Sequence, residues 1–386
     1  MNEVARFSIS NREFAIDLGH LSDRCFSVAS SPRPYTVSWE ESAATVVSKI
    51  VDALNESPTD FLLVDTNVFR IYFSGAKPPM RQCLLLDAVE TKKNIDTVLA
   101  TIDALEALSP SKNSMIHVVG GGITEDIGAF AACIYKRGMP WTFYPTTLLS
   151  MCDSCIGGKT GINYKNGKNQ LALFSAPRAV AICPEFLSSL TDREINSGYG
   201  EILKLLVTGG DGMLRLYGDA FDPILKMPAR SALKDLIFGA LLVKKAVVEE
   251  DEFELDLRRS LNYGHTIGHA LEVLSNYAIP HGQAVTLGLM IVNRMARERG
   301  LLPVEIEKRI NRFAIPLLKA TDLSTVAYDG LAELLQRDKK TQTGKFVFVF
   351  ISDIGRTLFV DYPKTPDTIA TIQSTIRDLI REVEIA

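Results

Sequence analysis

The chain has 386 residues, 46% of them hydrophobic, and a net charge of −4 from 42 Lys and Arg against 46 Asp and Glu. A chain this long exceeds the size at which one core stops growing, so we expect two domains. The near balance of charge argues against a nucleic-acid or membrane-surface partner, and no apolar run reaches the length of a membrane span or a signal peptide. We therefore expect a cytoplasmic protein.

The first half of the chain alternates predicted strands and helices. Short apolar runs at 61–65 and 115–119 predict buried strands of a parallel sheet. Apolar residues at helical spacing over 94–108 and 127–134 predict helices. This alternation is typical of a Rossmann-like, doubly wound α/β domain, which we assign to residues 1–190.

After about residue 190 the pattern changes to long helical stretches. These are predicted over residues 197–207, 229–250, 266–277 and 283–299. Two late β-rich runs, 345–351 and 357–360, are separated by a turn sequence and predict a hairpin. We expect residues 191–386 to form a second, mainly α-helical domain.

A run of three glycines, 120–122, follows the second predicted strand and precedes a helix start. Backbone N–H groups and the helix dipole at such a turn favour a phosphate or pyrophosphate group. The run lacks the Gly-x-Gly-x-x-Gly dinucleotide fingerprint, and a plain strand-to-helix turn explains it equally well. Asp65 ends the earlier strand, where acidic residues hydrogen-bond ribose hydroxyls. Together these features predict a bound nucleotide.

Two other chemistries are suggested by the middle of the chain, and both are disfavoured. Six cysteines are too sparse for a disulfide scaffold, and their mostly apolar contexts predict reduced, buried thiols. Cys152 and Cys155 have the spacing of a redox pair, but their flanks differ from a redox loop. The segment 153–160 is similar to a P-loop, but Asp153 stands where the first glycine belongs, which argues against an ATPase.

Three of the five histidines, His265, His269 and His281, lie close together in the sequence. Neutral imidazole is the commonest protein ligand for zinc, and rings four residues apart project from one helix face. Another predicted helix carries Glu201 and Lys204 on one face at positions i and i+3. A single histidine in such a context is more often a core residue whose ring nitrogens are hydrogen-bonded within the protein. The three together, with a carboxylate as a further ligand, predict a metal site.

The residues before these histidines are polar at helical spacing. If the segment is helical, Arg258, Asn262, His265 and His269 form one polar stripe where a core-facing helix would carry aliphatic residues. Gly264 lies inside this stretch and weakens the prediction of a continuous helix. We predict a polar, ligand-binding face on this part of the second domain.

The chain resembles the dehydroquinate synthases and, more broadly, the sugar phosphate cyclase superfamily. The resemblance runs from about Asp65 to at least Lys340 and rests on long motifs that occur in the same order. These motifs are Gly-Gly-Gly-Ile-Thr-Glu-Asp at 120–126, Arg-Gly-Met-Pro at 137–140, Pro-Thr-Thr-Leu-Leu at 145–149, Asp-Ser-Cys-Ile-Gly-Gly-Lys-Thr-Gly-Ile-Asn at 153–163, Gly-Lys-Asn at 167–169, Gly-Glu-Ile-Leu-Lys at 200–204, Asn-Tyr-Gly-His-Thr-Ile-Gly-His at 262–269, His-Gly-Gln-Ala-Val at 281–285 and Asp-Lys-Lys at 338–340.

The resemblance implies four groups of site residues. Its metal ligands are Glu201, His265 and His281, which would hold zinc, or alternatively cobalt, with coordination left open for substrate oxygens. Its NAD-binding positions are Asp65, Asn67, Glu90, Lys93, Gly121, Gly122, Asp126, Thr146, Thr147 and Lys168. Its substrate-pocket positions are Asp153, Lys159, Asn169, Lys204, Lys244, Arg258, Asn262 and His269. Its phosphate-binding positions are one or both of Lys339 and Lys340, and Arg137 supplied by the partner subunit of a homodimer.

The reaction implied by the resemblance is the cyclisation of a phosphorylated sugar acid, 3-deoxy-D-arabino-heptulosonate 7-phosphate. NAD transiently oxidises the C5 hydroxyl, phosphate is eliminated, NADH returns the hydride, and the opened ring closes by an intramolecular aldol step. The metal stabilises the alkoxide, while Lys159, Lys204 and Asn262 bond the developing charges. The implied protein is a carbon–oxygen lyase of the shikimate pathway, which supplies aromatic amino acid biosynthesis.

The substrate remains open within the superfamily, because some relatives act on sedoheptulose 7-phosphate or other sugar phosphates that lack a carboxylate. Arg258 and Lys244 fit a carboxylate, since a planar guanidinium grips this group with two hydrogen bonds. Asn262 also favours the heptulosonate. In contrast, Tyr164 replaces a usual histidine, and the following segment departs from the dehydroquinate synthase pattern, which is compatible with a specialised pathway.

Two further hypotheses come from other classes of protein. A metal-dependent polyol dehydrogenase would share the two-domain plan but release NADH stoichiometrically. Several lysines, including Lys159, Lys168 and Lys204, favour a phosphorylated substrate over that alternative. A catalytically inactive binding protein would be expected to lack at least one metal ligand, and all three are present in the sequence.

Overall fold

The computed structural model describes residues 3–165, 167–224, 227–318, 321–323, 330–331, 334–335 and 345–385. The chain divides into two compact units. One unit is Asp23–Leu190, and the other joins the described residues up to Ser22 to those from Thr191 onward. The predicted assignment of residues 1–190 to one domain therefore needs a correction at its beginning. The reason is long-range pairing of the first strand, described below.

The unit Asp23–Leu190 is built on a seven-stranded sheet with the order β3-β4-β11-β8-β7-β5-β6. The strands are β3 (Cys25–Val28), β4 (Tyr35–Trp39), β5 (Phe61–Asp65), β6 (Cys83–Leu86), β7 (Ile116–Gly120), β8 (Trp141–Pro145) and β11 (Ala179–Ile182). All neighbours are parallel except β3 and β4. The predicted strands at 61–65 and 115–119 are confirmed as β5 and β7.

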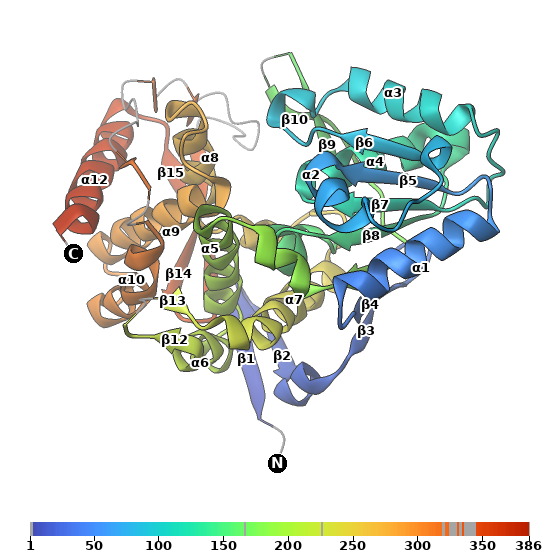
Figure 1. Ribbon diagram of the computed structural model, residues 1–386. Coiled ribbons are helices and arrows are strands. Elements are labelled where there is room, and N and C mark those ends of the chain that lie inside the picture. Colours follow the sequence, from blue (N-terminus) through green and yellow to red (C-terminus); the bar gives the residue numbers. More distant parts are fainter. Residues whose placement is uncertain are drawn as a thin grey trace. The chain divides into compact units, whose positions relative to one another are not determined.

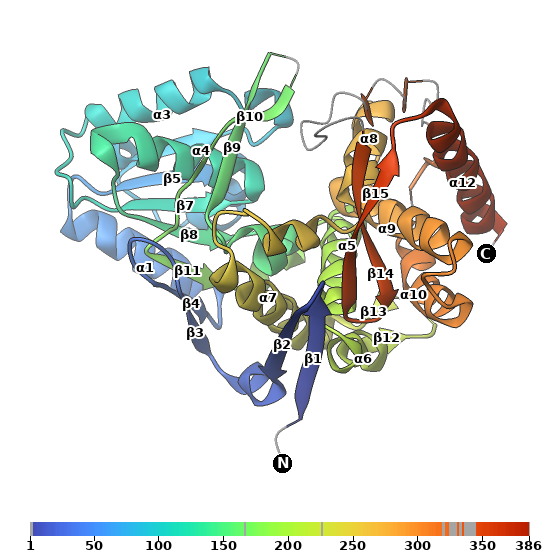
Figure 2. The same cartoon turned by 180° about the vertical axis from the view of Figure 1, so that it is seen from behind.

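Helices cover both faces of this sheet. In Figures 1 and 2, α3 (Ile95–Glu106) and α4 (Gly122–Ile134) lie on one face and α1 (Ala43–Glu56) lies on the other. Residues 61–64 of β5 are consequently buried, as expected for a strand covered on both sides. The predicted doubly wound α/β fold is confirmed for this unit.

A two-stranded antiparallel pair, β9 (Lys159–Tyr164) and β10 (Gly167–Phe174), packs against α4 in the same unit. The short helical segments of this unit are α2 (Thr66–Val68), η2 (Phe69–Phe73), η3 (Met80–Gln82), η4 (Glu90–Lys92), η5 (Tyr135–Arg137), η6 (Ser150–Ser154) and η7 (Pro184–Ser189). Sequence patterns did not predict β9 and β10, because a short pair rich in Gly, Lys and Asn lacks a clear alternation of apolar residues.

The other unit is mainly helical, as predicted. Its helices are α5 (Asp192–Thr208), α6 (Asp211–Ala220), α7 (Leu233–Glu250), α8 (His265–Leu274), α9 (His281–Glu298), α10 (Val304–Leu318) and α12 (Pro366–Ile385), and its short segments are η1 (Leu18–Ser22), β12 (Phe221–Asp222), β13 (Met227–Pro228), η8 (Arg230–Ala232) and η9 (Leu257–Asn262). Helix α9 is central, because it packs against α5, α8, α10 and α12 (Figure 1). Every residue from Gly282 to Ala296 is buried.

The predicted late hairpin is confirmed as β14 (Lys345–Asp353) and β15 (Arg356–Pro363). It belongs to a larger four-stranded sheet in the order β14-β15-β1-β2. β1 (Val4–Ile9) pairs in parallel with β15 and antiparallel with β2 (Arg12–Asp17). This pairing explains why the beginning of the chain belongs to the second unit.

Close helix crossings in this unit depend on glycines. A Cβ atom on Gly200 of α5 would lie 2.3 Å from the carbonyl oxygen of Gly282, and one on Gly282 would lie 1.8 Å from the carbonyl oxygen of Ser197. A Cβ on Gly288 would lie 2.1 Å from the carbonyl oxygen of Gly264. α9 therefore touches both α5 and the start of α8 backbone to backbone, which brings the beginnings of α8 and α9 close to the middle of α5.

The predicted continuous polar stripe is wrong in one respect. The 3-10 helix η9 ends at Asn262, and α8 begins only at His265. Gly264 lies between them with φ 79°, in the left-handed region, and a Cβ there would be 2.7 Å from backbone atoms of α9. Arg258 and Asn262 are thus on a different element from His265 and His269.

The thiol prediction is only partly confirmed. None of the six cysteines, all of which are described, forms a disulfide, and Cys152, Cys155 and Cys183 are buried. Cys25, the first residue of the edge strand β3, is exposed.

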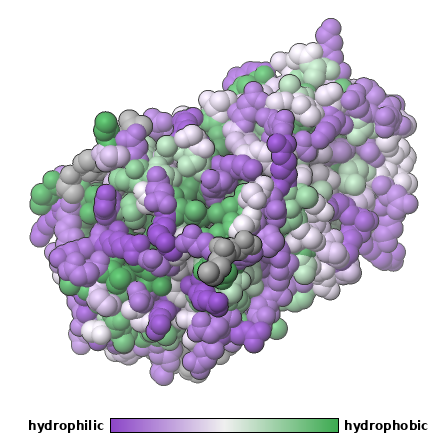
Figure 3. Space-filling view, turned by 90° about the horizontal axis from the view of Figure 1, so that it is seen from below, coloured by the Kyte–Doolittle hydropathy of each residue, from purple (hydrophilic) through white to green (hydrophobic). Residues whose placement is uncertain are grey.

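Hydrophilic residues surround the hydrophobic patches on the face drawn in Figure 3. In the described part of the chain, no helix combines the length and hydropathy needed to cross a bilayer.

Candidate functional site

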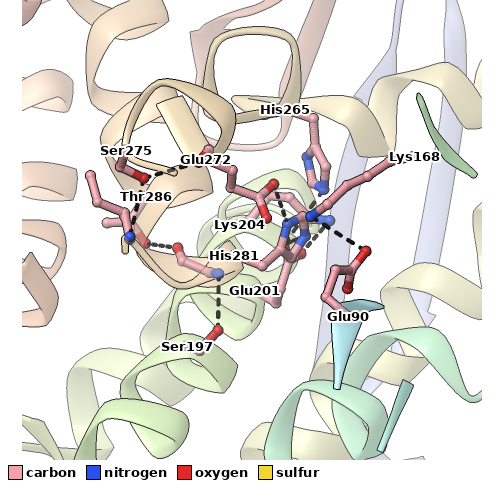
Figure 4. Close-up of polar contacts among 12 residues, drawn as sticks. Glu90, Lys168, Ser197, Glu201, Lys204, His265, Glu272, Ser275, His281 and Thr286 are labelled. Atoms are coloured by element: carbon pink, nitrogen blue, oxygen red, sulfur yellow. Dashed lines mark hydrogen bonds and ion pairs between the residues drawn. The ribbon is translucent and has the colours of Figure 1, made fainter. Parts of the chain in front are cut away.

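Three helices of the second unit each contribute one of the predicted metal ligands. Glu201 lies in the middle of α5, while His265 and His281 are the first residues of α8 and α9. The Nε2 atom of His265 is 3.5 Å from Oε1 of Glu201, and Nε2 of His281 is 3.2 Å from the same oxygen. The structure thus brings the three predicted side chains together, as Figure 4 shows.

The Glu201 carboxylate is fully buried yet stays charged. Burial alone would raise its pKa, but the neighbouring Lys204 ammonium and then His281 hold the pKa well below its usual range. Lys204 Nζ lies 2.6 Å from Oε2, as predicted from the i, i+3 spacing. Neither carboxylate oxygen has a hydrogen bond of good geometry despite these close contacts. Buried anionic oxygens of this kind, facing two imidazole nitrogens, fit a divalent cation.

Both imidazole rings are anchored through Nδ1. Nδ1 of His281 is 3.0 Å from Oε2 of Glu272, and Nδ1 of His265 is 3.3 Å from the backbone carbonyl of Tyr263. Burial would lower the pKa of His281, but the carboxylates of Glu201 and Glu272, one beside each ring nitrogen, raise it to about 10. Both rings therefore present Nε2 to Glu201, in the orientation that a shared cation needs.

His269 lies beside the same two rings. Its ring centroid is 5.2 Å from that of His265 and 5.6 Å from that of His281. The ligand atoms of the three histidines lie within 4.8 Å of one another, so they form a second grouping suited to a metal. His265 and His281 belong to both groupings. His269 is the most exposed of the three, whereas Glu201 supplies a buried charge.

The cationic residues predicted for the substrate pocket of this unit are buried. Lys204 is 2% exposed, Lys244 7% and Arg258 1%. The Arg258 guanidinium donates to the backbone carbonyl of Glu252. Three buried cationic side chains therefore come from α5, α7 and η9, and the first of them, Lys204, is paired with Glu201.

An acidic residue organises the loop before η9. The Asp251 carboxylate accepts hydrogen bonds from the backbone N–H groups of Leu255, Asp256 and Arg258 at 2.8, 2.8 and 3.0 Å. The Asn262 side-chain amide donates to Oε1 of Glu254 at 2.8 Å. Contacts within the protein therefore hold the backbone of Arg258 and the side chain of Asn262 in place without a ligand.

In the other unit, predicted nucleotide-binding residues follow the ends of parallel strands. Asp65 ends β5, Gly121 follows β7, and Thr146 follows β8, and these three strands are neighbours in the sheet. The carboxyl ends of parallel strands lie on one edge, where such folds bind ligands. A Cβ on Gly121 would be 2.9 Å from Thr147 Cγ2, so a larger residue at the helix entry would require the Thr147 side chain to shift.

The remaining residues at this edge have defined positions. Oδ1 of Asp65 accepts hydrogen bonds from the backbone N–H groups of Asn67 and Val68. The Asn67 side chain accepts from Arg70 at 2.9 Å. Gly122 begins α4, whose open N-terminal turn is the position predicted to hold phosphate.

Five other predicted residues form one polar cluster beside β9 and β10. Lys93 Nζ is 2.6 Å from Oδ2 of Asp126 and donates to Oδ1 of Asn169 at 2.8 Å. Burial raises the pKa of Asp126 against the opposing charge of Lys93. Glu90 lies 3.8 Å from Lys168 Nζ. Asn169, predicted for the substrate pocket, thus accepts a hydrogen bond from Lys93, which is predicted for the nucleotide site.

Three further predicted residues have a defined burial, and a fourth lies outside the described ranges. Asp153 is half-buried in η6, and Lys159 is exposed at the start of β9. Arg137 is exposed at the end of η5, with φ 60°. Lys340, together with its neighbour Lys339, lies outside the described residues.

Sequence reasoning missed the acidic residues that support the site, namely Glu272, Asp251 and Glu254. A signal for Glu272 was available, because it follows His265 and His269 at helical spacing i, i+4, i+7. Asp251 and Glu254 act within an irregular loop, where no periodicity points to them.

Comparisons with known proteins agree with this geometry. The family model described as 3-dehydroquinate synthase N-terminal matches residues 83–197, and the model described as 3-dehydroquinate synthase C-terminal matches residues 198–341. The chain is similar to a 3-dehydroquinate synthase of Streptococcus pyogenes serotype M49 (strain NZ131), at 35% identity over 271 residues, which are 69% of this chain and 74% of that protein.

Solved structures share the fold. A 2-deoxy-scyllo-inosose synthase complexed with carbaglucose-6-phosphate, NAD+ and Co2+ is 22% identical, with a TM-score of 0.79, covering 92% of this chain and 99% of that one. A 2-epi-5-epi-valiolone synthase from Streptomyces hygroscopicus subsp. jinggangensis 5008, with NAD+ and Zn2+ bound, is 23% identical, with a TM-score of 0.77 and the same coverage. At these identities the likeness establishes the two-domain fold.

Proposed function

This chain belongs to the 3-dehydroquinate synthase family, and from that premise we propose that it is an NAD- and metal-dependent sugar phosphate cyclase acting on a heptulosonate 7-phosphate. It is an enzyme of the carbon–oxygen lyase class, which eliminates phosphate and closes a carbocyclic ring. The observation that carries the proposal is the convergence of His265 and His281 on the buried carboxylate of Glu201.

Glu201, His265 and His281 would hold the cation. We prefer Glu201 to His269 as the third ligand because Oε1 of its buried carboxylate faces Nε2 of both His265 and His281, whereas the more exposed His269 can face substrate. When bound, the divalent ion, zinc or cobalt, supplies a Lewis acid for a substrate hydroxyl, and NAD supplies a reversible hydride acceptor. Lys204 is held beside Glu201, where its ammonium group can donate hydrogen bonds to substrate oxygens next to the metal site.

Nucleotide binding is proposed for the sheet edge of the other unit. Asp65 offers a carboxylate to ribose hydroxyls, and the N-terminus of α4 after Gly121 offers backbone N–H groups to pyrophosphate. Lys93 and Asp126 form an ion pair beside β9. We also propose a homodimer, in which the exposed Arg137 reaches the phosphate in the partner's site.

The function is tested by a phosphate-release assay on a substrate panel. The metal-loaded protein with trace NAD should release orthophosphate from 3-deoxy-D-arabino-heptulosonate 7-phosphate without net accumulation of NADH. Turnover of only sedoheptulose 7-phosphate or glucose 6-phosphate would move the assignment to a specialised cyclase. Stoichiometric NADH formation without phosphate release would instead identify a polyol dehydrogenase.

Replacing Arg258 by Ala should selectively impair substrates that carry a carboxylate. Loss of a buried charge-assisted pair costs about 2–5 kcal/mol, which is roughly thirtyfold or more in kcat/KM. The measurement compares kcat/KM for the heptulosonate phosphate with that for an analogue lacking the carboxylate. The neighbouring Arg259→Ala is the matched control, because the Arg259 side chain is 46% exposed and pairs with Asp256. Equal losses for both substrates would contradict the carboxylate role.

A further inference from the structure

We propose that Glu272 is a positioning residue that fixes the imidazole of His281 for metal binding. The inference rests on the proposed function, because it assumes that His281 is a metal ligand. Nothing in the family motifs used above assigns Glu272 a role. The evidence for this role is the position of the Glu272 carboxylate and of the Glu272 backbone in the structure.

The Glu272 side chain is buried and directed at the ligand. It is 6% exposed, and its Oε2 lies 3.0 Å from Nδ1 of His281 (Figure 4). Glu201 approaches the other nitrogen of the same ring, Nε2, at 3.2 Å. The ring is therefore held between two carboxylates that contact opposite nitrogens, and only the one at Nε2 shares that side with His265.

The backbone of Glu272 also shapes the turn that leads to His281. Its carbonyl oxygen accepts hydrogen bonds from the Ser275 hydroxyl at 3.0 Å and from the backbone N–H of Tyr277 at 2.7 Å. Ser275 Oγ in turn accepts from the backbone N–H of Ile279 at 3.2 Å. The same residue thus folds the linker between α8 and α9 and orients the side chain at its end.

In the neutral ring that binds a cation, this contact selects one tautomer. A carboxylate at Nδ1 accepts the Nδ1–H and leaves the Nε2 lone pair available on the side of Glu201 and His265. It also makes the imidazole a stronger donor to a cation. In the corresponding position, Nδ1 of His265 faces the neutral backbone carbonyl of Tyr263 at 3.3 Å, so the anchors of the two histidine ligands differ in charge. Loss of Glu272 would affect His281 and leave the anchoring of His265 intact.

The test measures metal binding directly, without NAD or substrate. Affinity for Zn2+ is determined by competition with a chromophoric chelator, and the visible absorption spectrum of the Co2+-loaded protein reports ligand geometry. Glu272→Ala should weaken affinity about 10–100-fold and alter the Co2+ spectrum. Glu272→Gln should weaken it less, because the amide oxygen still accepts the Nδ1–H but carries no charge.

Glu307→Gln is the matched control. Glu307 is a carboxylate of the same unit, 2% exposed and paired with Arg294 and Arg297, so its replacement costs buried ion pairs away from the site. It should leave the affinity and the Co2+ spectrum unchanged. If Glu272→Ala fails to fold, Glu272→Gln decides the question.

The outcomes separate the two proposals. If the wild type binds Zn2+ tightly and the folded Glu272 variants have the same Zn2+ affinity and the same Co2+ spectrum, the positioning role of Glu272 is wrong. The proposed metal-dependent function would not be affected by that result. Equal weakening by Glu307→Gln would also overturn it, because the effect would then reflect general loss of buried charge. Failure of the wild type to bind Zn2+ or Co2+ would overturn the proposed metal-dependent function itself.

Discussion

Replacement of His281 by Ala is expected to lower kcat/KM by about a thousandfold or more. The Lewis acid contributes several kcal/mol of charge stabilisation, and each 1.36 kcal/mol corresponds to a factor of about ten in rate. His281 is a suitable position because its side chain is 31% exposed, so truncation leaves the surrounding core largely intact. The measurement is kcat/KM by phosphate release, together with the metal content of the purified protein.

Chelation gives a parallel test on the unaltered chain. Removal of the metal from the wild type should abolish phosphate release, and added Zn2+ or Co2+ should restore it, whereas the His281→Ala protein should not respond. The exposed His20, in the same unit but in η1, supplies the control substitution to Ala. Full activity of His281→Ala, or of the chelated wild type, would rule out a metal held at this position.

A metal site in this unit was predictable from local spacings, whereas the ligand set Glu201, His265 and His281 was implied by the family resemblance. His265 and His269 are spaced for one helix face, and Glu201 and Lys204 are spaced for another, and both spacings hold in the structure. The strands β5 and β7 were predictable for a similar reason, since a strand buried on both faces is a continuous apolar run. Local periodicity thus predicted these helix faces and these strands.

Features that depend on distant partners were not predictable. β1 pairs with β15, nearly the whole chain away, and no pattern within β1 indicates which strand will lie beside it. The break before α8 has the same origin. Gly264 lies in the left-handed region and packs against the backbone of α9, which follows it in the sequence and leaves no room for a Cβ at this position. The support of His281 by Glu272 likewise appears only when α8 and the start of α9 are seen together.

Replacement of Gly282 by Ala is expected to destabilise the helical unit by about 3 kcal/mol or more, at or beyond the upper end of the usual cost of overpacking. The added Cβ would lie 1.8 Å from the carbonyl oxygen of Ser197. This atom belongs to the backbone of α5 and cannot rotate away, so the two helices have to separate. Separation would also disturb the hydrogen bond from the Gly282 N–H to Ser197 Oγ, which is 2.9 Å long.

The same substitution should weaken metal binding. Gly282 directly follows His281, and Ser197 lies one helical turn before Glu201, so moving α9 away from α5 draws two proposed ligands apart. The measurements are the midpoint of urea unfolding and the affinity for Zn2+. Gly218→Ala is the matched control, because Gly218 is also helical, in α6, and its added Cβ would meet only Phe313 Cζ at 3.6 Å.

Gly218→Ala should leave the unfolding midpoint unchanged or raise it slightly, since Ala is favoured over Gly in helices by up to about 1 kcal/mol. An unfolding midpoint for Gly282→Ala equal to that of the wild type would show that α5 and α9 can separate without cost. Lowered stability with unchanged Zn2+ affinity would show that the crossing supports the fold but does not set the spacing of Glu201 and His281. Loss of both properties together is the result that ties the glycine crossing to the chemistry of the site.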